Sequence, residues 1–234
     1  MKHTYLIVML TAVGSMLLSC KKDNFKAPAS TLNGKVVYKG EAIGVEFNQV
    51  PFQLYQFGFG KVGAIDGTFA PDGTYSTLLF DGDYKFIIPN GQGPFLWKKT
   101  AAGNPDTLNI ALRGSQSLDI EVTPYYMIRT PQLAASGGKV NATFKAEKII
   151  TDPALAKDIE SVTLYINKTQ FVSGANNIAA ATLNGAAITD PNNIALSVTI
   201  PAITPAQNYV FARVAIKIAG VEDRIFSPLQ KLTY

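Results

Sequence analysis

Few residues of this chain have side chains suited to covalent or metal chemistry. Cys20 is the only cysteine and His3 the only histidine. If the chain matures with Cys20 as its first residue and with the sulfur blocked, neither an imidazole nor a free thiol remains. That outcome excludes Ser-His-Asp triads, cysteine nucleophiles and zinc sites built on histidine or cysteine.

The N-terminal segment predicts the fate of Cys20. After a short basic start, residues 5–18 are mostly apolar. This stretch is too short to span a bilayer, which takes about 20 apolar residues. Residues 17–20 read Leu-Leu-Ser-Cys, which resembles the lipobox of bacterial lipoproteins. This resemblance implies that residues 1–19 are a signal peptide and that Cys20 is lipidated. A simple secretory leader followed by a chance cysteine is the alternative.

The residues after Cys20 indicate where the anchor would hold the protein. Two or more acyl chains on one residue suffice for stable membrane anchoring. Residues 20–31 carry small residues and a proline, which is typical of a flexible tether. Lys21-Lys22-Asp23 resembles the tag that routes Bacteroidota lipoproteins to the outer face of the outer membrane. The expected location is therefore the outer membrane, facing the cell exterior, with a periplasm-facing anchor as the alternative.

Charge and acidic residues argue against several classes of partner. The 21 Lys and Arg and the 17 Asp and Glu residues are scattered, and nucleic-acid binding needs a clustered basic surface, so no nucleic-acid partner is expected. The acidic loop residues do not have EF-hand spacing, and Asp-Gly pairs are ordinary turn residues. We therefore predict no metal site and no cofactor. The acidic loop residues considered for a metal site are Asp66, Asp72, Asp81 and Asp83.

The mature chain is predicted to be all-β. Runs with β-type periodicity recur between Gly, Pro, Asn and Asp residues, and no stretch shows sustained helical periodicity. Residues 32–123 are expected to form one sandwich and residues 124–234 a second. One short helix is expected at residues 152–158, where Asp152 could cap and Pro153 could occupy the first position.

Each predicted sandwich resembles a known fold. The first contains three motifs that are similar to those of transthyretin-like or carboxypeptidase-regulatory sandwiches: Gly34-Lys35-Val36, Asp72-Gly73-Thr74-Tyr75 and Gly82-Asp83-Tyr84. The second resembles a fibronectin type III or immunoglobulin-like domain near its end, through Ile203-Thr204-Pro205, Tyr209 and Ser227-Pro228-Leu229. These resemblances imply two tandem β-sandwiches of those types.

The whole layout resembles one family. A lipobox, the Phe80-Asp81-Gly82-Asp83-Tyr84 turn and a Val122-Thr123-Pro124-Tyr125 junction occur together in two-domain Bacteroidota surface lipoproteins. That family is numbered three-eight-two-three among the domains of unknown function. Its genes often lie beside SusC/SusD-type transporters, which implies an accessory role in glycan or peptide uptake with these transporter subunits as partners. The resemblance implies no catalytic residues.

Five aromatic residues are the candidate ligand contacts: Tyr55, Phe57, Phe59, Phe95 and Trp97. Sugar rings can stack on flat aromatic surfaces, and nearby glycines let a ligand approach the backbone. Packing at one end of a sandwich core is the alternative, and it is favoured because aromatic residues usually pack. Tyr125 and Tyr126 are expected to fill the junction between the two domains, where a ligand cleft is the alternative.

The sequence also offers one candidate modification site and two alternative functions. Asp106-Thr107-Leu108 resembles a three-residue O-glycosylation acceptor of exported Bacteroidota proteins, with Thr107 as the modified residue. A structural or adhesive surface module is the second functional hypothesis, although the chain has no internal repeat. A glycoside hydrolase, which needs two carboxylates across a cleft, is the least favoured because the glutamates are scattered.

Overall fold

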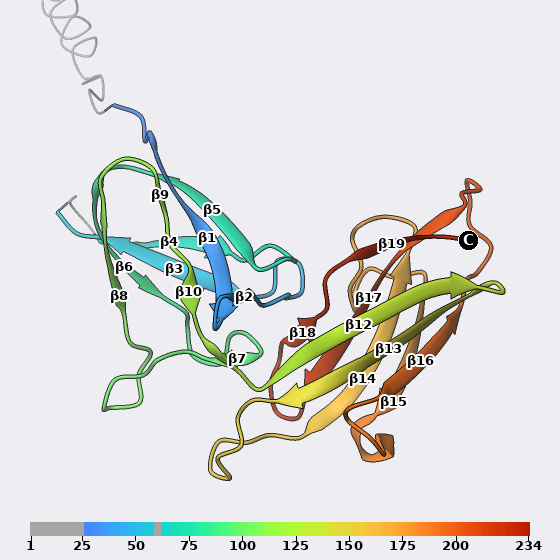
Figure 1. Ribbon diagram of the computed structural model, residues 1–234. Helices are drawn as coiled ribbons and strands as arrows, with labels where there is room; N and C mark the ends of the chain where they lie inside the picture. Colours follow the sequence, from blue (N-terminus) through green and yellow to red (C-terminus); the bar gives the residue numbers. More distant parts are fainter. Residues whose placement is uncertain (1–25, 59–61) are drawn as a thin grey trace, which may run out of the picture.

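The computed structural model describes residues 26–58 and 62–234, and almost all regular structure in these ranges is β (Figure 1). Within them the only helical element is a 3-10 turn, η1 (Gly185–Ala187). None of the described helices has the length and hydropathy to cross a bilayer. Cys20, the predicted lipidation site, and Phe59, one of the candidate ligand residues, lie outside the described residues.

The first domain is a sandwich of two sheets. In one sheet the central strand β1 (Ser30–Tyr38) pairs with β2 (Glu41–Ala42), β5 (Thr74–Leu79), β9 (Gln116–Ser117) and β10 (Ile120–Glu121). The other sheet has the order β4 (Ala64–Thr68), β3 (Pro51–Gln56), β6 (Gly82–Ile87), β8 (Leu108–Leu112). Between the sheets, the ring centroid of Phe52 lies 5.1 Å from the ring centroid of Phe69 and 5.1 Å from that of Phe86.

The second domain is also a sandwich of two sheets. One sheet has the order β12 (Tyr126–Ser136), β13 (Lys139–Lys148), β16 (Ile194–Thr199). The other has the order β15 (Ala179–Asn184), β14 (Ile159–Asn167), β17 (Tyr209–Ile218), β18 (Arg224–Phe226), and β19 (Gln230–Thr233) also pairs with β17. Alternate residues of β17 are fully buried, as its sequence pattern predicts. The predicted class of two tandem β-sandwiches is therefore confirmed.

The predicted helix at residues 152–158 is wrong. The structure has a single turn there, in which the Asp152 carbonyl accepts hydrogen bonds from the Leu155 and Ala156 amides. The Asp152 side chain accepts from the Ala154 amide at 2.9 Å, so it caps a turn rather than a helix. Leu155 is exposed, and a helix this short without an apolar face to bury is unstable.

Strands β1 and β12 depart from what the sequence pattern predicts. β1 begins at Ser30, inside the predicted tether of residues 20–31, because Ser30 and Thr31 pair with Leu79 and Leu78 of β5. The long strand β12 was not expected at all, because its pattern is interrupted by a bulge between Arg129 and Gln132.

Gly34, in the Gly34-Lys35-Val36 motif of the first sandwich, lies where another backbone segment passes close to β1. The Leu118 amide donates to the Asn33 carbonyl at 2.7 Å, so the segment between β9 and β10 runs closely past β1. A Cβ atom on Gly34 would lie 1.9 Å from the Leu118 carbonyl oxygen. The same oxygen accepts the hydroxyl of Tyr75 at 2.7 Å, which ties β5 to this crossing. Only glycine leaves room for these contacts.

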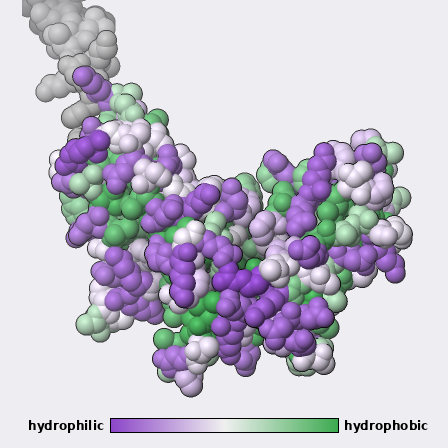
Figure 2. Space-filling model, viewed as in Figure 1, coloured by the Kyte–Doolittle hydropathy of each residue, from purple (hydrophilic) through white to green (hydrophobic). Residues whose placement is uncertain are grey.

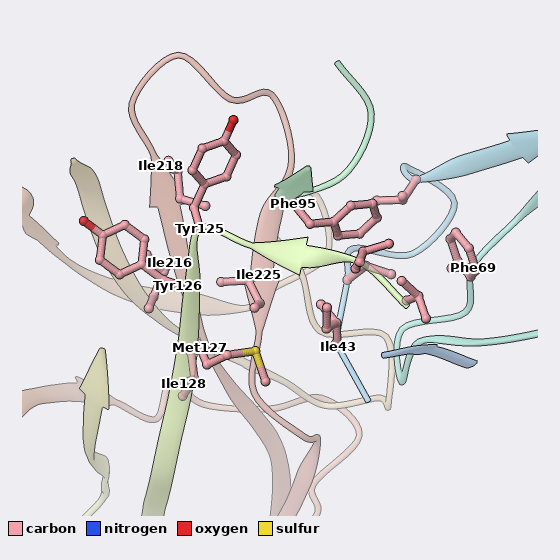
Figure 3. Packing of buried hydrophobic residues seen from close by; sticks show 14 of the residues in the cluster. Ile43, Phe69, Phe95, Tyr125, Tyr126, Met127, Ile128, Ile216, Ile218 and Ile225 are labelled. Carbon is pink, nitrogen blue, oxygen red and sulfur yellow. The ribbon is translucent and has the colours of Figure 1, made fainter. Parts of the chain in front are cut away.

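The two domains are joined by backbone pairing and by a continuous apolar core. β7 (Phe95–Leu96) pairs with β11 (Thr123–Pro124) at the junction, and the Phe226 amide of β18 donates to the Gly44 carbonyl at 2.9 Å. Figure 3 shows Ile43 and Phe95 of the first domain on one side of Ile225 and Met127 of the second. Most buried apolar residues of the two domains belong to one cluster, and a smaller second cluster lies in the second domain.

Buried carboxylates also cross this boundary. Asp223, which is 5% exposed, accepts the Gly93 amide at 2.7 Å. Glu46, which is 8% exposed, accepts the Gly174 amide at 2.9 Å and lies 3.4 Å from Arg224. Buried polar groups must be hydrogen-bonded, so these pairs hold the domains in one relative orientation.

Substitution of Gly34 by alanine should lower the free energy of unfolding by at least about 2 kcal/mol, because the added methyl group meets backbone. Equilibrium urea denaturation would measure the change. Gly63 is the matched control, since a Cβ there meets nothing within 4 Å. Equal losses for G34A and G63A would show that the crossing does not need glycine.

Asp223 should make stability fall as the pH rises from acid. Burial raises the pKa of Asp223 above its ordinary value of 3.8, although the bond from Gly93 opposes this. The folded state therefore holds the proton more tightly than the unfolded state, and this stabilisation is present below 3.8 and lost as the pH rises through the raised pKa.

The measurement is the difference in unfolding free energy between the wild type and D223N across the acidic range. Subtracting the variant removes the opposite slope of carboxyls with lowered pKa values, such as Asp72 and Asp81. The difference should decline with rising pH. A difference independent of pH would contradict the assignment.

Candidate functional site

A groove of about 740 Å³ lies where the two sandwiches meet. The first domain contributes β2, the loop that follows it and the turn at residues 70–74. The second contributes the start of β12, the loop after β14 and the segment from β18 to Leu229. Figure 2 shows the two lobes whose junction forms this site. Its walls are largely apolar, with Ile43, Met127, Ile225 and Leu229 among the lining residues.

Two exposed phenylalanines stand at this groove, one from each domain. Phe47 is 52% and Phe171 49% exposed, and their ring centroids are 5.7 Å apart in an edge-to-face arrangement. Their loops are joined by the bond from the Gly174 amide to Glu46, the neighbour of Phe47 in the chain. A partly buried hydrogen bond between the two loops thus helps to place the aromatic pair.

A buried guanidinium also lines the groove. Arg213, on β17, is 3% exposed, and it donates from Nε to the Ser227 carbonyl and from Nη2 to the Pro71 carbonyl, both at 3.0 Å. Its guanidinium carbon lies 4.4 Å from the centroid of the Phe226 ring. Burial lowers the pKa of Arg213 to about 10, while nearby Glu46 and Asp72 oppose the shift, so the side chain is charged at neutral pH.

Two acidic side chains complete the polar lining. Oδ1 of Asp72 accepts the amide and hydroxyl of Thr74 at 3.1 and 2.7 Å. Although partial burial raises it, these bonds bring the pKa of Asp72 below its ordinary value. Glu41 forms an ion pair with Arg129, which also pairs with Glu147 at 2.5 Å. Asp72 is therefore ionised at neutral pH, and the Glu41 carboxylate is engaged by Arg129.

The aromatic candidates predicted from sequence lie at two separate places. Tyr55 and Phe57 are at the free end of the β3–β4 hairpin, whereas Phe95 and Trp97 are beside the domain junction (Figure 1). Tyr55 donates to Oε1 of Gln53 at 2.9 Å, and Phe57 is 49% exposed with Nζ of Lys85 5.2 Å from its ring centroid. The structure does not bring the two sets together.

Phe95 and Trp97 pack at the base of the first domain. Phe95 is buried, and Trp97 lies edge-on to Phe86 of the core with its indole N–H donating to the Asp106 carbonyl at 2.8 Å. Together with Tyr125 they also line a smaller hollow of about 240 Å³ at the junction.

Tyr125 and Tyr126 are both buried at the start of the second domain and point to different sides of the chain (Figure 3). Tyr125 faces the smaller hollow just described. Tyr126 lines a different hollow of about 690 Å³ within the second domain and donates to the Lys157 carbonyl at 2.9 Å. Adjacent residues of an extended chain alternate in direction, so the two rings cannot serve one cleft.

The remaining sequence candidates have local partners. Thr107 is half-buried, and its amide donates to the Asp106 carboxylate at 2.8 Å. Of the acidic residues expected in loops, Asp66 lies on β4 and bonds to Gln53, and Asp83 lies on β6 and pairs with Arg113. Among the described residues, no three His, Cys, Asp or Glu side chains form a group that could hold a metal ion.

A ligand cleft at the domain junction was the alternative expectation for Tyr125 and Tyr126, but the residues that line this groove were not predicted as ligand contacts. Phe47 and Phe171 lie in loops, and Arg213 lies within a strand that otherwise looks like an ordinary core strand. The signal that could have pointed to Arg213 is its position next to Val214, in a run whose neighbours are almost all apolar. Burying such a charge is unfavourable unless it is hydrogen-bonded or paired, so its position in a core strand is unusual.

Two family models together match most of the chain. The model described as "Protein of unknown function (DUF3823) N-terminal domain" matches residues 30–123, and "Domain of unknown function (DUF3823_C)" matches residues 126–231. No curated protein matches this sequence.

Solved structures show the same architecture. A DUF3823 family protein from Parabacteroides merdae is 33% identical, with a TM-score of 0.76 over 89% of this chain and 100% of the other. One from Bacteroides ovatus is 30% identical, with a TM-score of 0.75 over 87% and 98%. A "putative carbohydrate binding protein" from Bacteroides uniformis shares the fold at 15% identity, with a TM-score of 0.71 over 88% and 100%. The chain belongs to the DUF3823 family, with both of its domains present.

Proposed function

We propose that this protein is a non-catalytic surface lipoprotein that captures glycan in the groove between its two sandwiches, as an accessory to a SusC/SusD-type uptake system. Lipid on Cys20 would hold it at the outer membrane, facing the cell exterior. The single observation that carries the proposal is the preformed groove with one exposed phenylalanine from each domain.

The composition of the groove suits a sugar. Pyranose rings have apolar C–H faces that pack on aromatic rings, and their hydroxyls need a small number of fixed donors and acceptors. Phe47 and Phe171 offer the aromatic surface, while Arg213 and Asp72 offer a donor and an acceptor. Since hydrogen bonds across the boundary fix the walls, little ordering would be needed on binding.

Two observations outside the groove support this reading. The Bacteroides uniformis protein with the same fold is described as a "putative carbohydrate binding protein". The lipobox-like residues 17–20 and the family resemblance support a surface role beside a transporter. Peptide is the other nutrient class that such systems import, and it is an outcome of the binding test below.

The protonation states of the groove favour binding over hydrolysis. A glycosidase needs one carboxylic acid with a raised pKa to protonate the leaving group. Asp72 has a pKa below its ordinary value, and Glu41 is ion-paired with Arg129. Asp72 is therefore unsuited to donate a proton at neutral pH, and the salt bridge already engages the Glu41 carboxylate, which supports a binding role.

Phe171→Ala should weaken glycan binding about tenfold, because truncating a central aromatic contact removes more than about 1 kcal/mol of binding free energy. Isothermal titration calorimetry against the glycans retained by a glycan array would measure the change. Phe57→Ala is the matched control, since Phe57 has the same 49% exposure but lies on the far hairpin. Loss of binding in F57A alone would place the site at the aromatic residues predicted from sequence. If the protein bound peptides but no glycan, peptide would replace glycan as the ligand.

Cys20→Ser should release the protein from membranes, because the acyl chains supply the anchoring free energy. Fractionation of cells that express the wild type or C20S would show the shift from membrane to soluble fractions. Co-purification of the wild type with transporter subunits from detergent extracts would test the accessory role. A wild type that purifies without these partners would favour a structural or adhesive module.

A further inference from the structure

We infer that the groove selects an uncharged glycan, with hydroxyl groups bound by Arg213 and Asp72 rather than a carboxylate bound by Arg213 alone. This inference rests on the proposed function, since it names the class of ligand that the same groove would take. It is argued from the unused hydrogen-bonding atoms and the charges of the lining residues.

Arg213 has donors left over for a ligand. Its Nε and Nη2 atoms donate to the Ser227 and Pro71 carbonyls, and the hydrogen bonds among described residues leave Nη1 without a partner. No buried side-chain nitrogen or oxygen of the described residues lacks a partner. Nη1 is therefore not fully buried, and since Arg213 lines the groove we assign Nη1 as the atom that a ligand would reach.

Asp72 has an acceptor left over in the same groove. Its Oδ1 atom receives both bonds from Thr74, and no bond among the described residues uses Oδ2. Arg213 and Asp72 are close enough to influence one another electrostatically, and both line the groove. A sugar hydroxyl can donate to one group and accept from another, so neighbouring hydroxyls suit this donor and acceptor.

The charges of the lining disfavour an anionic ligand. The groove contains Arg213, Asp72 and Glu41 but no lysine among its lining residues. Glu41 is balanced by Arg129, and the Arg213 cation is already influenced by Asp72 and Glu46. A carboxylate entering the groove would gain Arg213 but also lie near the like charge of Asp72, which repels it. A neutral ligand meets no such opposition.

The test compares wild type with D72N on an array of neutral and uronic-acid oligosaccharides, followed by calorimetry on those that bind. Asparagine can still accept the Thr74 amide, so the turn should persist in D72N. The wild type should bind neutral members only, and D72N should bind them about tenfold more weakly because a charge-assisted hydrogen bond is lost.

Asp66→Asn is the matched control, since Asp66 is an exposed acid of the same domain that does not line the groove. Preferential binding of uronic-acid glycans by the wild type, or unchanged neutral binding in D72N, would overturn the inference and leave glycan capture standing. Equal losses in D72N and D66N would overturn it as well. Absence of binding to every glycan would overturn the proposed function together with the inference.

Discussion

The structure depends on how the β17–β18 hairpin of the second domain docks on the first. The backbone bond from Phe226 to Gly44 continues sheet pairing across the domain boundary. A Cβ on Gly44 would lie 2.4 Å from the Phe226 carbonyl oxygen, so this approach requires glycine. Because backbone atoms meet backbone atoms there, the two sandwiches have one close-packed relative position, and the groove has one shape.

Buried charges reinforce this docking at a cost. Arg213, Glu46 and Asp223 are each less than a tenth exposed and each bonds to the backbone of the opposite domain. Burying such groups is unfavourable unless they are hydrogen-bonded, and apolar side chains of similar size would often stabilise as well. Directional hydrogen bonds fix the orientation of one domain relative to the other. This property suits a site that is built from both domains.

The fold could be predicted from sequence where alternation is strong and uninterrupted. β13 and β17 can be recognised from their sequences, because their alternate residues are apolar and face one core. β12 was missed because Thr130, with a positive φ, and Pro131 stand at its bulge and break the pattern. The expected helix failed because residues 152–158 have capping chemistry but no face to bury. Local signals were reliable only where tertiary packing agreed with them.

The sequence by itself determined the covalent inventory and the fold class. One cysteine, one histidine and recurrent β-type runs restrict both the chemistry and the architecture before any contact is known. Only the tertiary structure decided where a ligand could bind. The groove draws Phe47, Asp72, Phe171 and Arg213 from segments far apart in the chain, and each looks ordinary in its local sequence. Their meeting follows from the angle between the domains, which buried long-range contacts set and no local pattern encodes.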